Sequence, residues 1–243
     1  METLKNKVAL VAGGSSGIGL AIGRALGEAG CSVVLSARSV DKLEAEAAAM
    51  TDRGVGAVAH PADLTEEKAV DTLFEAVTQR FGRLDFLVNA TGAFDGGPID
   101  RLSLEAWNRV ISTNLTAPFL CTRAAMRIMK KQRSGRILNI GSTSAKRVRP
   151  DTAPYCASKF ALAGLSESTA LEGREFGITC CCLHPGNVRV ERRRHTGLPE
   201  DDEPMIDTEQ IAALALTMAA MPGHATVLEA TVLPRDQLYV GRG

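Results

Sequence analysis

The sequence predicts an α/β protein built on a doubly wound parallel sheet of about seven strands, with helices on both faces. Two observations support this fold class. Short β-branched apolar runs recur along the chain, and stretches with the period of an amphipathic helix lie between them. Such a chain winds with right-handed crossovers and binds ligands at the carboxyl ends of its strands.

The expected strands begin, in chain order, near residues 8, 32, 56, 84, 136, 178 and 226, with the sequences VALVA, SVVLS, GAVAH, LDFLVN, RILNI, ITCCCL and TVLEATVL. Three intervening stretches, 19–30, 40–54 and 69–82, have helical period, and each ends in a glycine typical of a helix C-terminus. The polar stretch 187–204 contains Pro and Gly and interrupts the alternation of strands and helices. We expect a long loop over the substrate there, at about 187–206.

Length and charge limit the organisation and the partners of the chain. At 243 residues, without an internal repeat or a low-complexity linker, it is expected to form one domain over 1–243. Its 28 basic and 28 acidic side chains balance, which argues against nucleic acid or a membrane surface as a partner. Glycines interrupt the first apolar run, and the run IAALALTMAAM is too short to span a bilayer, so we expect a cytoplasmic protein.

The six cysteines are expected to be reduced, buried side chains. Three of them are consecutive in ITCCCLHPG and the others are scattered, which fits neither a disulfide framework nor the spacing of metal ligands. No metal is therefore expected. We interpret His184, in the same segment, as a strand-end histidine with its hydrogen bonds satisfied.

Three glycines, Gly13, Gly17 and Gly19, follow the first expected strand in VALVAGGSSGIGLAIG, where the next helix opens. Without side chains at these positions, backbone N–H groups and the helix dipole can approach a pyrophosphate. The spacing differs from G-x-G-x-x-G, and a tight turn without a ligand is the alternative. Its place after the first strand of an alternating chain favours a Rossmann-like dinucleotide site.

Tyr155 and Lys159, in PYCASKFALAG, are four residues apart at the start of an apolar helix, so their side chains share one face. A cation beside a phenol stabilises the phenolate, which suits general acid–base chemistry. Pro154 and an N-cap at Asp151 or Thr152 predict a sharply defined start of this helix.

The glycine spacing and YCASK together resemble the compact, single-domain branch of the short-chain dehydrogenase/reductase family, and the likeness runs along nearly the whole chain. Further motifs agree in order: ADL after the third strand, NATG after the fourth, then STNLTAPF, NIGSTS and HPGNV. The chain departs from the family pattern at Ala12, Ala90, Thr91 and Val190.

The resemblance implies a catalytic tetrad of Asn114, Ser142, Tyr155 and Lys159. Ser142 would hold the carbonyl oxygen on which negative charge develops, and Tyr155 would deliver the proton. Lys159 would stabilise the phenolate and bind the nicotinamide ribose, while Asn114 would hold a water that reconnects the site to solvent. Taken singly, Ser142 could be a strand-end cap and Asn114 a helix amide bonded to backbone.

The resemblance also implies which residues contact a nicotinamide dinucleotide along its whole length. They are Gly13, Ser15, Ser16, Gly17, Ile18, Gly19, Arg38, Asp63, Leu64, Asn89, Ala90, Tyr155, Lys159, Pro185, Gly186 and Val188. In VVLSARS, Ala37 occupies the position at which NAD-preferring folds carry an acidic residue, and Arg38 follows it. NADP(H) is therefore expected to be preferred over NAD(H).

The expected function is the NADP(H)-dependent interconversion of a small-molecule carbonyl and a secondary alcohol, in a homo-oligomer that is a tetramer or a dimer. One alternative is a β-ketoacyl-carrier-protein reductase, since Arg133 matches one docking residue of that group, although Phe176 stands where the second is expected. Another is a catalytically silent dinucleotide-binding regulator. The basic residues within 189–194 could attract an anionic substrate, but charge pairing on the loop is the preferred interpretation.

Overall fold

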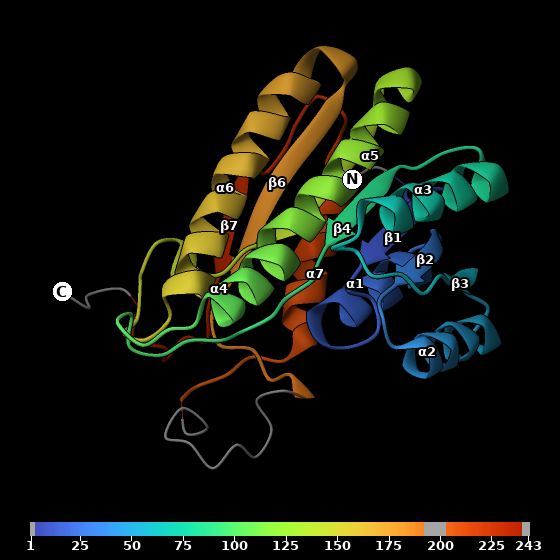
Figure 1. Ribbon diagram of the computed structural model, residues 1–243. Coiled ribbons are helices and arrows are strands. Elements are labelled where there is room, and N and C mark those ends of the chain that lie inside the picture. Colours follow the sequence, from blue (N-terminus) through green and yellow to red (C-terminus); the bar gives the residue numbers. More distant parts are fainter. Residues whose placement is uncertain (1–2, 192–202, 240–243) are drawn as a thin grey trace.

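The computed structural model describes residues 3–191 and 203–239, which one seven-stranded sheet organises (Figure 1). Neighbouring strands are all parallel, in the order β3-β2-β1-β4-β5-β6-β7. The strands are β1 (Val8–Ala12), β2 (Ser32–Ser36), β3 (Ala57–Ala59), β4 (Phe86–Asn89), β5 (Gly135–Ile140), β6 (Ile178–Pro185) and β7 (Glu229–Val232). The predicted α/β fold class is confirmed.

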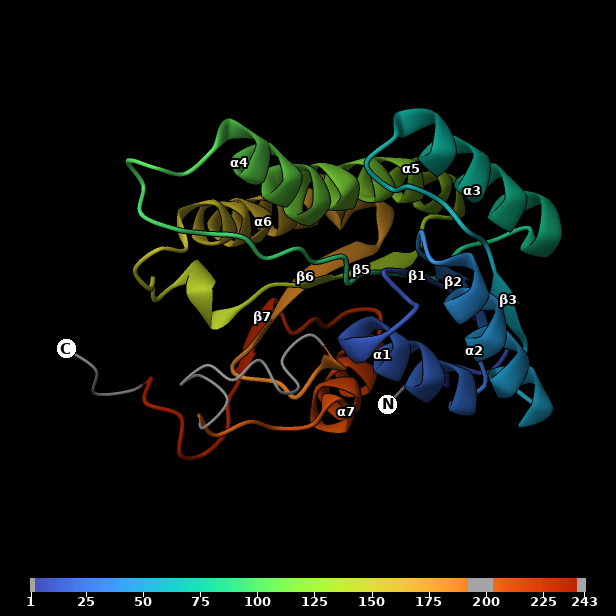
Figure 2. The same cartoon turned by 60° about the horizontal axis from the view of Figure 1, so that its bottom comes forward.

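Helices cover both faces of the sheet (Figure 2). One face carries α1 (Gly17–Glu28), α2 (Val40–Asp52) and α7 (Thr208–Ala219), and the other carries α3 (Glu67–Phe81), α4 (Leu104–Ile111), α5 (Ala117–Gln132) and α6 (Ala153–Gly173). The ends of α1, α2 and α3 lie within two residues of the ranges predicted from helical period. The last strand is shorter than its apolar run, because only Glu229–Val232 pairs with β6.

Side chains alternate across each strand and so divide the core between the two helical layers. In β1, Val8 and Leu10 join the buried cluster under α3 and α5, while Ala9 and Val11 join the cluster under α1 and α7. Cys180 and Cys181 in β6 separate in the same way, and all six cysteines are free and buried as predicted. Strands that are buried on both faces explain the continuous apolar runs in the sequence.

The sheet reverses its strand order at β1, which pairs with β2 on one side and β4 on the other. Ala12, Ser36 and Asn89 are in register at the carboxyl ends of these strands. Loops that leave this edge diverge to opposite faces and open a crevice, which is where ligands of such sheets bind.

The predicted loop at about 187–206 lies partly outside the described residues, because 192–202 are not described. Its two described ends meet in a single parallel bridge between Val188 and Ile206. Backbone hydrogen bonds of 2.8 Å from Arg189 N to Ile206 O and of 3.0 Å from Ile206 N to Asn187 O support the bridge. Among the described helices, none combines the length and the apolar character that a bilayer crossing requires.

Candidate active site

The glycine-rich turn after β1 packs directly on the segment that follows β4. Gly13 has φ +89°, and a Cβ atom there would lie 2.7 Å from the carbonyl carbon of Ala90. A Cβ atom on Gly19 would overlap the carbonyl oxygen of Gly13. The Gly13 N–H donates to Ser36 O at 2.8 Å, which ties the turn to β2. Glycine is therefore required at these two positions by close backbone approach.

The first turn of α1 is open to an anion. Ser16, at its N-cap, has extended backbone, and among the described residues its side chain caps no N–H of the helix. The N–H groups of Gly17, Ile18 and Gly19, which follow the turn residue Ser15, therefore have no acceptor within the helix and carry the positive end of its dipole. Phosphates suit such a site, so these residues fit the pyrophosphate of a dinucleotide.

The expected adenosine contacts lie together at the carboxyl ends of β2 and β3. The N–H of Ala62 donates to Ala37 O at 3.0 Å, which brings the two loops together. Hydrogen bonds from Thr65 lower the pKa of the Asp63 carboxyl, and the positive charge of nearby Arg38 acts in the same direction. The Arg38 side chain is exposed and Leu64, next to Asp63, is buried.

Tyr155 and Lys159 lie in the first two turns of α6, as predicted. Pro154 is in the first turn of that helix. Thr152 is the N-cap residue, but its hydroxyl donates to Arg149 O at 2.7 Å instead of capping the helix. The Lys159 Nζ atom lies 5.8 Å from the centre of the Tyr155 ring and donates to Ile140 O at 2.8 Å. The pair therefore faces the carboxyl end of β5.

Lys159 is a buried cation whose charge is not balanced locally. Its side chain is 3% exposed. Within residues 3–191 and 203–239, no carboxylate lies at ion-pair distance from its Nζ atom. Buried lysines are costly unless they are paired, so the fold keeps this ammonium at an energetic cost.

Ser142 follows β5 and begins the short 3₁₀ turn Thr143–Ala145. Its side chain is buried, and its Oγ accepts from the Ser144 N–H at 3.1 Å. It therefore does cap a turn, which was one of the two interpretations of this residue. Accepting that bond leaves the hydroxyl proton available for a ligand, so capping does not exclude a second role.

Asn114 lies in a π-helical turn, Ser112–Thr116, between α4 and α5. The side chain is fully buried, its Oδ1 accepts from Ala93 N at 2.7 Å and its Nδ2 donates to Ala93 O at 2.9 Å. Nδ2 also lies 3.2 Å from Ser158 Oγ, and Ser158 in turn donates to Tyr155 O at 2.7 Å. Asn114 is thus joined to the start of α6 through Ser158; the water that it was expected to hold stays a prediction.

Ser158 is a buried site residue that the sequence motifs did not single out, although it stands inside YCASK, directly before Lys159. A serine at that place is indistinguishable from an exposed helix residue until the helix is packed against the π-helical turn. The signal that could have found it is the spacing: Tyr155, Ser158 and Lys159 fall at i, i+3 and i+4 on one helical face.

Asn89, at the end of β4, belongs to a buried polar chain rather than to the open crevice. Its Nδ2 donates to Asn139 Oδ1 at 2.7 Å and to Thr122 Oγ1 at 3.1 Å. Asn139 continues the chain by donating to Ser166 Oγ of α6 at 2.7 Å. The chain links β4, β5, α5 and α6, so Asn89 helps to position the elements of the site.

The Pro-Gly segment ends β6 and turns into the loop. Pro185 is the last strand residue, and a Cβ atom on the following Gly186 would overlap the side-chain oxygen of Gln237. That oxygen accepts from the Asn187 N–H at 2.8 Å, so the C-terminal segment holds the turn in place. Val188, next along, is buried under α7. Gln237 has no sequence motif around it and could not have been identified from the sequence.

Two basic residues near the site are paired with acids of the loop region: Arg149, before α6, and Arg189, within the loop. Arg149 Nη2 lies 3.2 Å from Glu203 Oε2, which also accepts from Asn187 Nδ2 at 2.6 Å. Arg189 pairs with Asp207 at 2.5 Å. Local charge pairing, the preferred interpretation, is therefore found at Arg149 and Arg189. The basic residues 192–194 lie outside the described residues.

A cavity of about 450 Å³ opens beside the start of α6. It is bounded by the loop after β4 and the loop before α6, and its lining is Phe94, Asp95, Gly96, Gly97, Pro150, Asp151 and Thr152. The Phe94 ring is 5.2 Å from the Tyr155 ring, centre to centre, and half exposed. A small molecule in this cavity would therefore lie next to the Tyr155 ring.

A comparison with protein families matches residues 7–200 to the short chain dehydrogenase model. Among curated proteins, the chain is 33% identical over 238 residues to a D-β-hydroxybutyrate dehydrogenase of Rhizobium meliloti, with 88% of this chain and 91% of that protein covered. It is 36% identical over 188 residues to a 3-oxoacyl-(acyl-carrier-protein) reductase of Haemophilus influenzae, with 77% of this chain and 76% of that protein covered.

The fold is also similar to a solved structure of an actinorhodin polyketide ketoreductase variant with NADPH. The TM-score is 0.88 and the sequence identity is 30%, over 96% of this chain and 98% of the other.

Proposed function

The chain belongs to the short chain dehydrogenase family, and from this premise we propose that it is an NADP(H)-dependent oxidoreductase that interconverts a carbonyl and a secondary alcohol. The observation that carries the proposal is the buried Lys159: among the described residues no carboxylate lies at ion-pair distance from its Nζ atom, which is 5.8 Å from the centre of the Tyr155 ring. Burying an ammonium that has a carbonyl but no carboxylate beside it costs free energy. A phenol that must pass through its anionic form provides a functional reason for that cost.

The chemistry divides between four side chains. A bound nicotinamide would supply or accept the hydride. As a carbonyl is reduced, negative charge grows on its oxygen, so the oxygen must be held and then protonated. We assign the holding to the Ser142 hydroxyl and the proton to the Tyr155 hydroxyl. Lys159 stabilises the phenolate that remains and contacts the ribose, and Asn114 holds the water that returns the proton; in oxidation these roles reverse.

NADP(H) is the proposed cofactor because the adenosine end of the crevice is cationic where it would bind a 2′-phosphate. Arg38 is exposed at the end of β2 and, among the described residues, has no ion-pair partner. Ala37 supplies no carboxylate to repel the phosphate. The ketoreductase that is similar in fold was solved with NADPH, which agrees with this choice.

The test is turnover of a panel of ketones, ketoacyl thioesters, quinones and steroids with NADPH, followed by its absorbance. We expect oxidation of NADPH with at least one class, and none when the carbonyl is omitted. NADPH binding without turnover of any class would instead support a dinucleotide-binding regulator.

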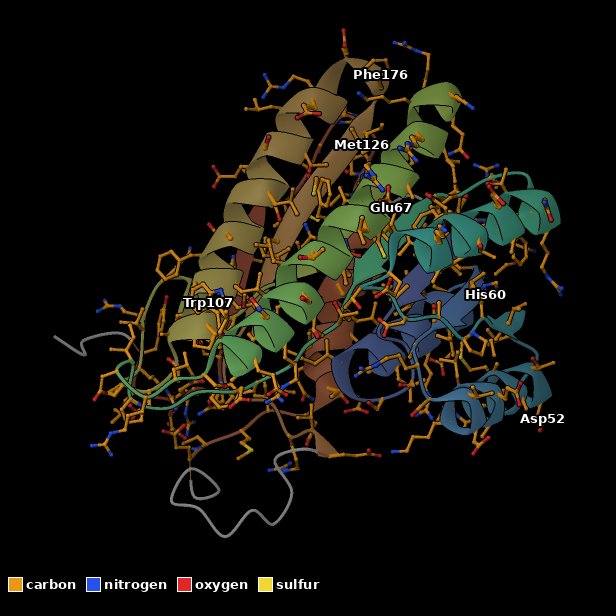
Figure 3. All side chains as sticks on the ribbon, in the orientation of Figure 1. Asp52, His60, Glu67, Trp107, Met126 and Phe176 are labelled. Atoms are coloured by element: carbon orange, nitrogen blue, oxygen red, sulfur yellow. The ribbon has the colours of Figure 1, made fainter. Side chains whose placement is uncertain are left out.

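A β-ketoacyl-carrier-protein reductase is the second candidate, because a relative with 36% identity carries that name. Arg133, its expected docking residue, already donates to Glu175 O at 2.8 Å, and its guanidinium lies 5.9 Å from the centre of the Phe176 ring. Figure 3 places Phe176 at the far end of the molecule from the start of α6. Faster turnover of a ketoacyl group on its carrier protein than on a short thiol, with the difference lost in Arg133→Glu, would favour this candidate.

We also propose that the protein is a homo-oligomer. Large apolar side chains are exposed on neighbouring helices, namely Leu104 and Trp107 of α4 and Phe119 of α5, the second of which is labelled in Figure 3. Exposed apolar surface of this kind is typical of protein contacts. Sedimentation of the wild type should give a dimer or a tetramer, and Phe119→Asp should shift it towards the monomer.

A further inference from the structure

His184 is a buried titratable side chain that the proposed chemistry does not use. It precedes Pro185 in β6 and is fully buried. Its ring lies against the backbone of Ser142, with Nδ1 3.2 Å from Ser142 N and 2.9 Å from Ser142 O. A Cβ atom on Gly141 would lie 2.5 Å from the same Nδ1. The strand that leads into Ser142 is therefore shaped to the histidine ring.

The other side of the ring faces an acid. Nε2 lies 2.8 Å from Glu229 Oε1, although the N–H does not point straight at that oxygen, so the contact is electrostatic rather than a well-formed hydrogen bond. Glu229 begins β7 and also contacts Lys146 Nζ at 2.6 Å. Lys146 directly follows the 3₁₀ turn that Ser142 begins. One chain of contacts therefore links Ser142 to β6 through His184, to β7 through Glu229, and back to Lys146 at the end of the turn.

The two contacts of Nδ1 belong to different tautomers of the neutral ring: with the proton on Nε2, Nδ1 accepts from the Ser142 N–H, and with the proton on Nδ1, it donates to Ser142 O. The proposal takes the first tautomer, because its Nε2 proton lies on the side of the Glu229 carboxylate. Burial lowers the pKa of His184, and the Lys146 and Lys159 ammonium groups act in the same direction, against Glu229 and the Ser142 carbonyl. The ring is therefore neutral near pH 7.

We propose that His184, held by Glu229, is a positioning residue that fixes the backbone of Ser142 and so directs the Ser142 hydroxyl at the substrate oxygen. The inference rests on the proposed function, because it gives the histidine a role only if Ser142 contacts the substrate. Ser142 lies between a strand and a tight turn, and its Oγ accepts from the Ser144 N–H at 3.1 Å. A shift of the backbone would therefore move the hydroxyl with it, and misplacement by about 1 Å can cost about 100-fold in rate.

Protonation would change which backbone group of Ser142 the ring holds. A second proton, on Nδ1, removes the acceptor of the Ser142 N–H and makes Nδ1 a donor to Ser142 O, 2.9 Å away. The groups that face the ring are Glu229 from β7, Lys146 from the segment after the turn, Lys159 from α6 and Cys182 from its own strand. Because the pKa of His184 is lowered from 6.5, the proposal predicts that kcat falls as the pH decreases below 6.5. This decrease is called the acid limb.

Two substitutions of His184 distinguish the role of Nδ1 as a hydrogen-bond acceptor from the role of the ring in filling space. In His184→Asn, the amide oxygen can take the place of Nδ1 and accept from the Ser142 N–H, whereas His184→Leu has a similar branched shape and no acceptor. We expect the Leu variant to lose about 10-fold or more in kcat, with KM and the NADPH dissociation constant within about 3-fold of wild type. The Asn variant should keep most of kcat and lose the acid limb, because the amide does not titrate.

A double-mutant cycle decides whether His184 acts through Ser142. On a Ser142→Ala background, His184→Leu should cost less than about 3-fold, because the hydroxyl that it positions is already gone. A matched control is Cys181→Ala, which removes a fully buried side chain of the same strand on the other face and should lower stability without changing the pH profile. Equal losses from His184→Leu on both backgrounds, or full activity of the single variant, would overturn the inference.

If His184→Leu does not fold, Glu229→Gln provides the test. The amide removes the charge that favours the protonated ring, so the acid limb should move to lower pH, and an unmoved limb contradicts the proposal. Failure of the proposed function is distinguishable from failure of this inference. If the proposed function fails, wild-type protein turns over no carbonyl with NADPH. If only this inference fails, wild-type protein turns over a carbonyl, and so do the variants at residue 184, whether or not they keep a hydrogen-bond acceptor there.

Discussion

Asp85 and Lys159 are charged side chains that are buried at opposite ends of the sheet, and their surroundings differ. Asp85, at the amino end of β4, is 5% exposed and has four contacts. Arg83 donates to it from Nε at 2.8 Å and from Nη2 at 2.6 Å, Lys7 Nζ lies at 3.3 Å, and the Val8 N–H donates at 2.9 Å. Lys159, at the carboxyl end, is 3% exposed and is bonded to the carbonyl of Ile140.

The difference separates a structural charge from a functional one. Asp85 joins the starts of β1 and β4 with all of its oxygens occupied, which is how buried carboxylates contribute to stability. Lys159 lies next to a phenol, and no carboxylate within residues 3–191 and 203–239 forms an ion pair with it. Variants at the amino end should therefore change stability with little effect on kcat, and variants at the carboxyl end should do the reverse.

The largest effect is expected from Tyr155→Phe, which should lower kcat by about 10² to 10⁴ because the proton donor is removed. The ring still packs beside Phe94, so NADPH affinity and the unfolding midpoint should stay close to wild type. Steady-state kinetics measure the loss of kcat, and thermal unfolding measures the midpoint. A variant with more than about a tenth of wild-type kcat would show that another group delivers the proton.

Asp85→Ala should lower the free energy of unfolding by about 2 to 3 kcal/mol, because the Val8 N–H loses its acceptor in a buried place. The folded fraction should keep wild-type kcat. Urea unfolding measures the first quantity, and Arg83→Ala, which changes a partner that is 46% exposed, is a milder control. Loss of kcat in folded Asp85→Ala would contradict the claim that the buried charge at the amino end of the sheet serves stability and not catalysis.

Wild-type protein should bind NADPH about 10 to 100 times more tightly than NADH, since a charge-assisted hydrogen bond to a 2′-phosphate contributes about 1.5 to 3 kcal/mol. The double variant Ala37→Asp with Arg38→Ala should reverse the order, because a carboxylate then faces the phosphate. Dissociation constants from fluorescence titration decide the point. Tighter binding of NADH by the wild type would remove NADP(H) from the proposal.

The smallest effect concerns acid stability. Burial opposes ionisation of Asp85, but the hydrogen bonds from Arg83 and Val8 and the charges of Lys7 and Arg83 leave its pKa below the ordinary 3.8. The folded protein therefore binds fewer protons than the unfolded chain as the pH falls towards and below about 4, and stability decreases there. The stability gap between wild type and Asp85→Ala should narrow from pH 6 to pH 3. A constant gap would mean that the carboxylate is not responsible.

The strands, the helices and their order along the chain could be predicted from the sequence, because the periodicity of apolar residues and the glycines at helix ends are local signals. The strand sequences, the glycine ends of α1 to α3 and the pair Tyr155 and Lys159 depend on neighbours within a few residues. The Tyr-Lys spacing also indicated the direction of both side chains, since i and i+4 always share a helical face.

The support of the site could not be predicted, because it depends on residues far apart in the sequence. Asn114 reaches Ser158 across 44 residues, and Asn187 reaches Gln237 across 50. His184 was expected to have its hydrogen bonds satisfied, which is confirmed at Nδ1 but wrong at Nε2, which has no hydrogen-bond partner among the described residues. The acid beside Nε2, Glu229, comes from a strand that pairs only in the folded sheet. No local pattern marks such contacts.

The measurement that tests the central claim most directly is the pair of values, free energy of unfolding and kcat at saturating NADPH, for Lys159→Met. Methionine has a similar length and no charge, so it removes the buried ammonium and leaves the packing largely intact. The account predicts unchanged or higher stability together with a loss of kcat of about 100-fold or more. Lower stability with kcat retained would contradict it, because Lys159 would then serve the fold and not the reaction.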